Sequence, residues 1–421
     1  MSEILHPSPG GKGRGWGEPY NNVENTSSAP RPLDGITVLS LEQAVAAPFA
    51  TRQLADLGAR IIKIERPGAG DFARNYDTRV NGLASYFVWL NRSKESLTLD
   101  VKHPEAKNIL AKLLQKSDVF VQNVAPGAAA RLGLSAQTLR KDHPRLIVCD
   151  ISGYGNDGPY RDKKAYDMML QAEAGVIAAT GTPQSQARPG LSVADISAGM
   201  YGYSSILAAL LLRERTGEGS HIDVSLFETM AEWMGNPLYY TYDGAQPPAR
   251  SGAFHPSVQP YGPFRAGDGR EVMLAVQNER EWLVFCAEVL RQPAMAADAR
   301  FSSNVLRAAN RAVLVEAIEA VFAALSADEV IARLDKAGIA TASVNSVDKL
   351  WQHPQLRARG RWREIGSPAG PLPALLPPGR NDRFDYRMEG VPAVGEHTAA
   401  ILAELGYESD RIAALRRAGA V

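Results

Sequence analysis

Residues 36–65 read ITVLSLEQAVAAPFATRQLADLGARIIKIE. The apolar run at 36–41 is typical of a buried strand, the stretch 47–57 has helical spacing, and 60–65 is again strand-like. Two apolar strands joined by a helix favour a parallel pair. This unit predicts an α/β fold.

The same alternation continues along the chain. We expect a helix at 104–116, strands at 119–122 and 146–151, a long small-residue helix at 194–215, and a strand at 221–226. Strands that alternate with helices predict a doubly wound parallel sheet. After residue 236 the sequence changes to Pro- and Gly-rich loops, a strand pair within 261–276 and helices between 279 and 334. This change indicates a second, smaller unit, and further helices are expected at 396–404 and after 409.

Length and composition bound the class of protein. A chain of 421 residues is longer than a single hydrophobic core usually supports, so two units are expected. Residues 1–32 have the composition of a disordered leader. The formal net charge is zero, which argues against nucleic acid or a membrane surface as a partner. The two cysteines, Cys149 and Cys286, lack metal-ligand spacing, so we expect no metal site and a reducing, cytoplasmic setting.

Basic residues and small residues cluster where predicted strands end. Ala44, Ala46 and Ala47 open a helix without the GxGxxG dinucleotide fingerprint, so local features favour a structural turn over a ligand site. Arg66 follows a predicted parallel strand, the position at which open α/β sheets bind ligands. Together with other basic residues it would neutralise the phosphates of a nucleotide-like cofactor, although each is equally explained as a surface charge. These residues are Arg92, Lys94, Lys102 and Arg131.

One carboxylate stands out at a predicted helix start. Ala165, Tyr166 and Asp167 open a helical run after a Gly-rich loop. By residue type alone, N-capping is the more frequent role of such an aspartate. A partly desolvated carboxylate beside free backbone N–H groups is the alternative, and it would act as a nucleophile.

Several motifs along the chain resemble those of one enzyme family. They are LDGITVL, LADLGARIIKIERPGAGD, NRSKESLTLDVKHPE, DVFVQNVAPGAAARLGL, PRLIVCDISGYGNDGPY, AYDMMLQAEAG, RTGEGSHIDVSLFE and HPSVQPYGPF, in this order. In kind and order they resemble the class III CoA-transferases, a family that includes alpha-methylacyl-CoA racemases. The resemblance spans 33–421.

The resemblance implies an architecture. Members form interlocked homodimers of ring-like chains, each with a large Rossmann-like parallel-sheet domain built from both chain ends and a smaller inserted α+β domain. For this chain it implies a large-domain part at 33–225, a linker and small domain at 226–335, and a return to the large domain at 336–421. The active site would lie between the large domain of one subunit and the small domain of the other, near SGAFHPSVQPYGPF.

The resemblance also implies a reaction, the transfer of CoA from an acyl-CoA to a free carboxylic acid. Coenzyme A is then a substrate, and the motif that contains Tyr166 and Asp167 makes Asp167 the expected nucleophile. An aspartyl anhydride and an enzyme–CoA thioester would be the intermediates. The residues expected to bind coenzyme A are Val45, Ala46, Arg66, Leu99, Lys102, Asn123, Val124, Arg131 and Tyr154.

Two alternatives stay open. A racemase would pair Asp195 with a histidine, but Tyr166 occupies that position, and an unperturbed tyrosine is a poor base near neutral pH. A CoA-binding protein without turnover would need no carboxylate at Asp167. Likeness to dicarboxylate-using members suggests succinyl-CoA and a small dicarboxylic acid, for which Arg74 and His255 are candidate contacts, while loops 153–158 and 251–252 are candidate oxyanion donors.

Overall fold

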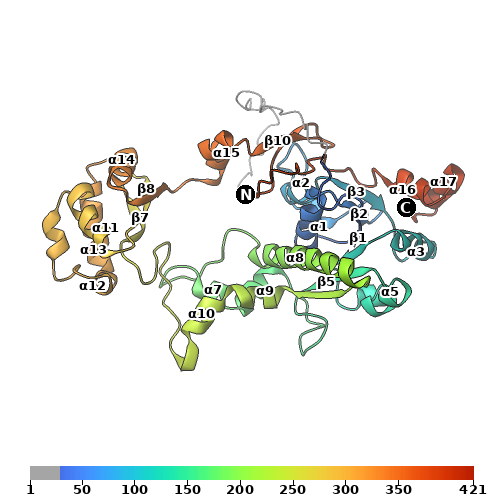
Figure 1. The fold of residues 1–421 in the computed structure, drawn as a ribbon, viewed down its shortest axis with the longest axis horizontal. Helices are drawn as coiled ribbons and strands as arrows, with labels where there is room; N and C mark the ends of the chain where they lie inside the picture. The colour runs from blue at the N-terminus through green and yellow to red at the C-terminus, as the bar shows by residue number, and fades with distance from the viewer. Residues whose placement is uncertain (1–28) are drawn as a thin grey trace, which may run out of the picture.

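The computed structural model describes residues 29–421. The leader expected at 1–32 falls, up to residue 28, outside the described residues. Two bodies of unequal size are joined by two separate stretches of chain, one before β7 and one after the last strand of the smaller body (Figure 1).

The larger body is organised by a six-stranded sheet in which every pair of neighbours is parallel. The strand order is β3-β2-β1-β4-β5-β6, the order of a Rossmann fold, and this confirms the predicted doubly wound sheet. The order reverses between β1 and β4, so the connections that follow these two strands run to opposite faces of the sheet, and ligands of such folds bind at this switch point. The strands are β1 Thr37–Leu41, β2 Arg60–Glu65, β3 Lys94–Thr98, β4 Val119–Gln122, β5 Ile147–Ser152 and β6 His221–Ser225.

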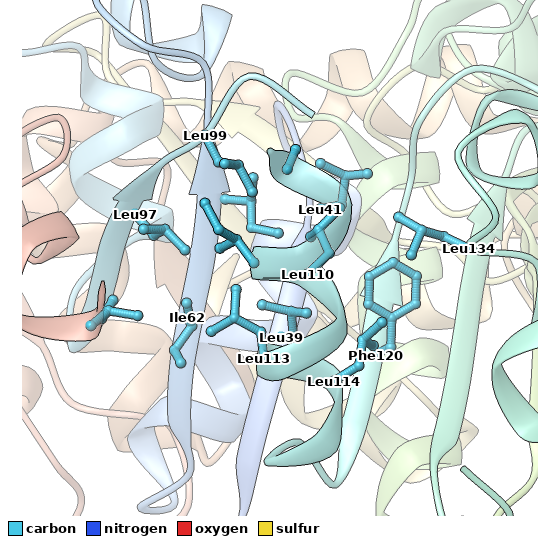
Figure 2. Close-up of a cluster of buried hydrophobic side chains, with 14 of the residues drawn as sticks. Leu39, Leu41, Ile62, Leu97, Leu99, Leu110, Leu113, Leu114, Phe120 and Leu134 are labelled. Atoms are coloured by element: carbon cyan, nitrogen blue, oxygen red, sulfur yellow. The ribbon is translucent and has the colours of Figure 1, made fainter. Parts of the chain in front are cut away.

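Helices cover both faces of this sheet because alternate strand residues point to opposite sides. One apolar cluster contains Leu39, Ile62 and Phe120 and is covered by α3 (Ala106–Gln115), α5 (Ala136–Asp142), α16 (Thr398–Glu404) and α17 (Ser409–Arg417). Figure 2 shows the leucines of α3 over these strands. The opposite cluster lies under α1 (Ala46–Asp56), α6 (Asp167–Glu173), α8 (Val193–Thr216) and α9 (Leu226–Trp233).

Both ends of the described chain build this larger body. Thr98 of β3 donates its backbone N–H to Thr398 Oγ1 at 2.9 Å, and the N–H of Asp100 bonds to the carbonyl of Ala420 at 2.8 Å. Figure 1 accordingly places α16 and α17 beside β3 and α3, far along the sequence from them. These contacts join the C-terminal segment to the edge of the sheet.

Helix α8 runs close to α1 because small residues face it. A Cβ atom on Gly199 would come within 2.7 Å of the Ala46 carbonyl oxygen, so only glycine permits this approach. Among residues 29–421, α8 alone is long and apolar enough to cross a membrane by length and composition, a weak indication. In this fold α8 packs against α1, β5, β6 and α9.

The smaller body is a three-stranded antiparallel sheet with helices on it. Its core contains Trp282, Phe285 and Phe322, each at most 1% exposed. Strand β9 pairs with β8 and lies past residue 335, where the small unit was expected to end, while α9 packs on α8 in the larger body. The elements are β7 Tyr261–Arg265, β8 Glu271–Ala275, α11 Glu279–Val284, η3 Phe285–Val289, η4 Pro293–Ala297, α12 Asn304–Ala309, α13 Arg311–Phe322, α14 Ala327–Ala337 and β9 Ala340–Ser343.

Short elements complete the described chain. A two-stranded antiparallel ribbon, β10 (Trp362–Ile365) and β11 (Leu372–Leu375), packs through Ile365 and Leu372 against Phe87 of the larger body. The others are η1 Phe72–Asn75, α2 Ser85–Leu90, α4 Ala128–Arg131, α7 Val176–Ala179, α10 Gly235–Tyr240, η2 Tyr242–Gly244, η5 Val347–Gln352 and α15 Pro354–Ala358.

Candidate active site

The loops at the carboxyl ends of β1 and β4 are joined by paired hydrogen bonds. Asn123 accepts from the backbone N–H of Gln43 at 2.8 Å and donates its Nδ2 to the carbonyl of Gln43 at 2.9 Å. Ala44, which follows, has a left-handed φ of 62°. The turn that precedes α1 is therefore fixed against the β4 loop at the topological switch point, where α/β sheets bind their ligands.

The residues expected to bind coenzyme A lie on loops that leave this same edge of the sheet. Arg66 follows β2, Leu99 and Lys102 follow β3, Asn123 and Val124 follow β4, and Tyr154 follows β5. Val45, Ala46 and Leu99 have buried side chains, so any contact they make with a ligand is through the backbone or a small apolar surface.

Three of the expected basic residues have their charged ends unpaired. Among residues 29–421, the side chains of Arg66, Lys102 and Arg131 form no ion pair, and all three are exposed. Arg131 folds back over Gly127, where a Cβ atom would lie 3.0 Å from its Nη1. Gly127 has a φ of 71°, so glycine suits both the backbone and the space. These cations are available to phosphate groups.

Arg92 and Lys94, which the sequence also suggested as phosphate-binding residues, point into the protein. They are therefore not among the exposed, unpaired cations. Arg92 forms a buried ion pair with Asp56 at 2.7 Å, and Lys94 donates to Glu42 at 2.7 Å. Both residues lie between the end of α2 and the start of β3, and α1 covers their side chains. The sequence pattern of charges cannot distinguish these inward lysine and arginine residues from outward ones.

Asp167 stands at the start of α6 and caps α8. Its Oδ1 accepts from the backbone N–H groups of Ala194 at 2.9 Å and Asp195 at 3.4 Å, and its Oδ2 accepts from Gln171 Nε2 at 2.6 Å. Burial raises the pKa of Asp167, while these hydrogen bonds act in the opposite direction. The half-buried carboxylate thus satisfies N–H groups that the first turn of a helix leaves unpaired, and they fix its orientation.

Asp195 lies in the first turn of α8 beside Asp167, and its carboxyl group has a different environment. In the part of the chain that is described, neither oxygen of its carboxyl group accepts a hydrogen bond. Burial, followed by the negative charge of Asp167, raises the pKa of Asp195 to about 7. Such a shift is a frequent mark of a functional site, and the sequence pattern gave Asp195 a role only in the racemase alternative.

Aromatic residues form one side of the space around Asp195. The Tyr76 and Tyr86 rings meet edge to face at 5.7 Å, and Tyr86 meets Trp89 at 6.2 Å. Burial and then the charges of Asp71 and Asp195 raise the pKa of Tyr76 to about 12. Tyr86 Oη lies 3.3 Å from Ser192 Oγ at the start of α8. These contacts bring the segment around η1 and α2 against the end of α8 that holds Asp195.

Tyr154 belongs to a second aromatic group next to α6. It meets Tyr160 edge to face at 5.3 Å, its hydroxyl donates to Glu173, and Lys163 Nζ lies 5.1 Å from its ring centroid. Lys163 also bonds to Glu173 Oε2 at 2.8 Å. The loop that follows β5 is thereby tied to the helix that begins with Asp167.

The candidates for a substrate carboxylate are already engaged. Arg74 makes a two-pronged ion pair with Glu65, with both contacts at 2.8 Å, and donates to the carbonyl of Pro392. His255 stacks on Tyr261, and its Nδ1 accepts from the N–H groups of Ser257 and Val258. Arg74 therefore has a structural partner, which the sequence alone did not indicate.

Two backbone donors considered for an oxyanion hole are also taken. The N–H of Gly155 bonds to Ser152 Oγ at 2.9 Å, and the N–H of Gly252 bonds to the carbonyl of Gly181 at 2.8 Å. Within residues 29–421, no group of three or more His, Cys, Asp or Glu side chains is arranged to hold a metal ion. Cys149 and Cys286 are both buried and free.

The Rossmann-type sheet, with basic residues on the loops at its carboxyl edge, is the fold of an α/β protein of the class that binds nucleotide-like cofactors. The sequence model of CoA-transferase family III matches residues 33–398, and this chain belongs to that family. The chain is also 32% identical to the succinyl-CoA:glutarate CoA-transferase of Mus musculus over 417 residues, covering 98% of this chain and 94% of that protein.

Two further comparisons agree. The acetyl-CoA:oxalate CoA-transferase of Acetobacter aceti is 34% identical over 385 residues, which cover 91% of this chain and 98% of that protein. A crystal structure of a CAIB/BAIF family protein from Brucella suis superposes with a TM-score of 0.80 at 34% identity. That superposition covers 89% of this chain and 100% of the other. The family expected from the motifs is confirmed, and the chain is a CoA-transferase of class III.

Proposed function

We propose that this enzyme transfers CoA from succinyl-CoA to a small dicarboxylic acid such as glutarate, through covalent aspartyl intermediates. The murine succinyl-CoA:glutarate relative, similar over nearly the whole chain, supports this choice. A relative of similar identity is named for acetyl-CoA and oxalate, so overall identity does not fix the acids. Direct measurement of the acids is therefore part of the test.

The reacting carboxylate in this proposal is Asp167, which the motif also favours. Its two oxygens accept three hydrogen bonds, which favour the ionised form. Asp195 accepts none within the described residues, and its pKa is raised to about 7. The negative charge of the pair therefore lies first on Asp167, and only an ionised carboxylate attacks a thioester. This difference in hydrogen bonding is the observation that supports Asp167 as the nucleophile.

Asp195 then acts as a neutral neighbour of the nucleophile. While its carboxyl group keeps its proton, the site holds one negative charge instead of two. A second charge would repel the tetrahedral oxyanion and the CoA thiolate that form beside it, and the repulsion is strong because the site is partly desolvated. The proton on Asp195 thus favours both of these charged species.

The reaction proceeds by acyl exchange alone. A carboxylate oxygen of Asp167 attacks the thioester carbonyl, the C–S bond breaks, and CoA leaves as a thiolate. The thiolate attacks the aspartyl carbonyl of the anhydride, which releases the donor acid and leaves an aspartyl–CoA thioester. The incoming carboxylate attacks this thioester, the C–S bond breaks, and a second aspartyl anhydride forms as CoA thiolate leaves. The thiolate then attacks the acyl carbonyl of this anhydride, which gives the new acyl-CoA and releases Asp167 as a carboxylate.

Coenzyme A would be held by the unpaired cations Arg66, Lys102 and Arg131 together with the loops after β1, β4 and β5. Its phosphates carry charges of the sign that these side chains neutralise. The aromatic surface of Tyr76, Tyr86 and Trp89 would restrict water near the anhydride, which would otherwise hydrolyse.

An interlocked homodimer in the cytoplasm completes the proposal. The two bodies are joined by two separate chain segments, an arrangement through which a second copy would thread (Figure 1). Large apolar side chains on α9 and α10 are exposed in the single chain, among them Leu238 at 64% and Tyr239 at 78%. Exposed apolar clusters of this kind mark surfaces that a partner covers. The buried free cysteines suit a reducing compartment.

The test is a panel of acyl-CoA donors and free acids, with new thioesters followed by mass spectrometry. We expect succinyl-CoA and glutarate to give glutaryl-CoA. Asp167→Asn should lower the rate more than about 10³-fold, as loss of a nucleophile does. Alpha-proton exchange on a branched acyl-CoA without transfer would instead support a racemase, and CoA binding without either reaction would indicate an inactive binding protein.

A further inference from the structure

A chain of hydrogen bonds runs beneath the loops at the carboxyl edge of the sheet. Gln122, the last residue of β4, donates its Nε2 to Asp150 Oδ1 at 2.8 Å and accepts from the backbone N–H of Val124 at 2.9 Å. Asp150 Oδ2 accepts from His221 Nε2 at 2.8 Å and from Asn156 Nδ2 at 3.3 Å. Asp150 therefore joins β4, β5 and β6 and the loops that follow the first two.

The register of the sheet brings these side chains to one face. Gln122 pairs with Asp150, and Val148 pairs with His221, so the alternation of side chains directs all of them to the face covered by α3 and α5. Asp150 is 7% exposed and Gln122 is 8% exposed. A buried carboxylate that accepts several hydrogen bonds is held rigidly, because each lost bond leaves a buried polar group unpaired.

The contact between Asp150 and His221 is also electrostatic. The hydrogen bond with Asp150 raises the pKa of His221 against the opposing effect of its burial; the charges of Asp150 and Asp223 raise it further, and that of Arg140 lowers it. Asp223 itself accepts from the backbone N–H of Asn156 at 2.9 Å. The loop after β5 is thus anchored at two points, by Asp150 and by Asp223.

The two loops that meet at Asp150 carry expected CoA-binding residues. Val124 lies on the β4 loop between Asn123 and the helix that bears Arg131, and Asn156 lies two residues after Tyr154. Asn123 in turn fixes the turn before α1 through Gln43. One buried carboxylate is therefore linked, directly or through Gln122 and Asn123, to three loops that carry expected CoA-binding residues.

We propose that Asp150 is a positioning residue for coenzyme A, which holds Gln122 and Asn156 so that the β4 and β5 loops grip the cofactor together. This inference rests on the proposed function, because it takes those loops as the CoA site. Asp150 takes no part in the chemical step.

The variants that test this proposal are Asp150→Asn, which sets an amide N–H₂ against another donor, and Gln122→Leu, which removes the link with little change in volume. The matched control is Asp118→Asn. Asp118 lies at the opposite, amino edge of the same sheet, where it accepts from Thr37 N–H at 2.9 Å and pairs with Arg213 at 3.1 Å. All three variants lose hydrogen bonds made by a carboxylate of the sheet or by its partner. Only Asp150→Asn and Gln122→Leu affect the loops after β4 and β5.

The measurements are the Kd of CoA by calorimetry and the KM and kcat of transfer. Both Asp150→Asn and Gln122→Leu should weaken CoA binding and raise the KM for acyl-CoA about tenfold, the effect of one hydrogen bond to a charged group. The KM for the free acid and kcat should stay near the parent values. Asp118→Asn should lower Tm while the Kd of CoA is unchanged.

Parent-like CoA binding in both Asp150→Asn and Gln122→Leu would overturn the positioning role while leaving the proposed function intact. A kcat that falls as much as CoA affinity would also contradict it. If the parent enzyme itself does not bind CoA, the proposed function fails first. Should Asp150→Asn not fold, the Kd of CoA for Gln122→Leu decides between the same two outcomes.

Discussion

Two neighbouring aspartates at the start of α6 and α8 lie in different surroundings. Burial and then the charge of Asp167 raise the pKa of Asp195 to about 7, whereas three hydrogen bonds oppose the effect of burial on the pKa of Asp167. Asp167 therefore ionises first, whereas Asp195, which accepts no hydrogen bond among the described residues, keeps its proton to higher pH. Within residues 29–421 the buried Oε1 of Gln171 accepts no hydrogen bond, so this amide can turn to accept one from an asparagine that replaces Asp167. Asp167→Asn is therefore a conservative variant that keeps the cap of α8 and removes the charge of the proposed nucleophile.

The first residue-scale prediction concerns the dependence of rate on pH. The pKa of Asp195 is raised to about 7, and its ionisation adds a second negative charge beside the reaction centre. We therefore expect kcat/KM to fall as pH rises through this region. In Asp195→Asn the falling limb should disappear while transfer continues within about tenfold of the parent rate. A limb that is unchanged in this variant would contradict the coupling of the two carboxyl groups.

The second residue-scale prediction concerns stability. The pKa of Asp195 is higher in the folded protein than the ordinary aspartate value, so ionisation destabilises the fold as pH rises above that ordinary value. Asp195→Asn should therefore raise Tm at pH 8, and the gain should shrink as the pH is lowered toward 4. Thermal unfolding at both pH values measures this. An equal change at both would mean that charge is not the cause.

At the scale of elements, a buried group of charges holds β1, β2, β3 and the turn before α1 together. Lys63 bonds to Asp71 at 2.8 Å and to Glu42 at 3.3 Å, and Lys94 bonds to Glu42 at 2.7 Å. Asp71 also accepts from the N–H of Ala44 at 3.2 Å. The neighbouring carboxylates raise the pKa of Lys63 despite its burial, while burial lowers the pKa of Lys94 to about 8.

Removing one member of this buried group should strongly destabilise the fold. Glu42→Ala leaves two buried ammonium groups without their shared partner, and the free energy of unfolding should fall by about 3–5 kcal/mol. The control is Glu404→Ala, which breaks the half-exposed pair with Arg60 and should cost less than about 1 kcal/mol. Urea denaturation compares the two. Similar losses would show that the buried group is not a cooperative unit.

Strands were predictable from the sequence, whereas the directions of charged side chains were not. The runs at 60–65 and 119–122 coincide with β2 and β4 because Ile, Val and Phe, which favour strands, are concentrated in them. The pair β10 and β11 gave no such signal, since these strands are short and half exposed. Arg92, Lys94 and Arg74 were indistinguishable from surface cations because their partners, Asp56, Glu42 and Glu65, are distant in sequence or separated by a loop.

In the candidate site, too, contacts between residues distant in the sequence could not be predicted. The motif containing Asp167 drew attention to the start of α6, while the N–H groups that hold its carboxylate lie 27 residues later and meet it only in the fold. The raised pKa of Asp195 likewise depends on its burial and on the charge of Asp167 beside it. Properties set by burial and by contacts between distant segments have no local sequence signal.

At the scale of the whole molecule, a single chain exposes large apolar side chains to solvent. Tyr239, Tyr242 and Val347 are each at least 77% exposed, although their side chains are large and apolar. We predict that the native protein has about twice the chain mass of 45.4 kDa in light scattering. The mass should not fall on dilution into the nanomolar range, because interlocked chains cannot separate without unfolding. A species of single-chain mass with full activity would contradict the interlocked homodimer.

The proposed covalent bond between CoA and Asp167 can be tested directly. The enzyme is mixed with succinyl-CoA, the aspartyl–CoA thioester is trapped with hydroxylamine, and the resulting hydroxamate is located by tandem mass spectrometry. We expect modification at Asp167, present in Asp195→Asn and absent in Asp167→Asn. Modification at Asp195 would reverse the two roles, and transfer without any aspartyl adduct would contradict the mechanism.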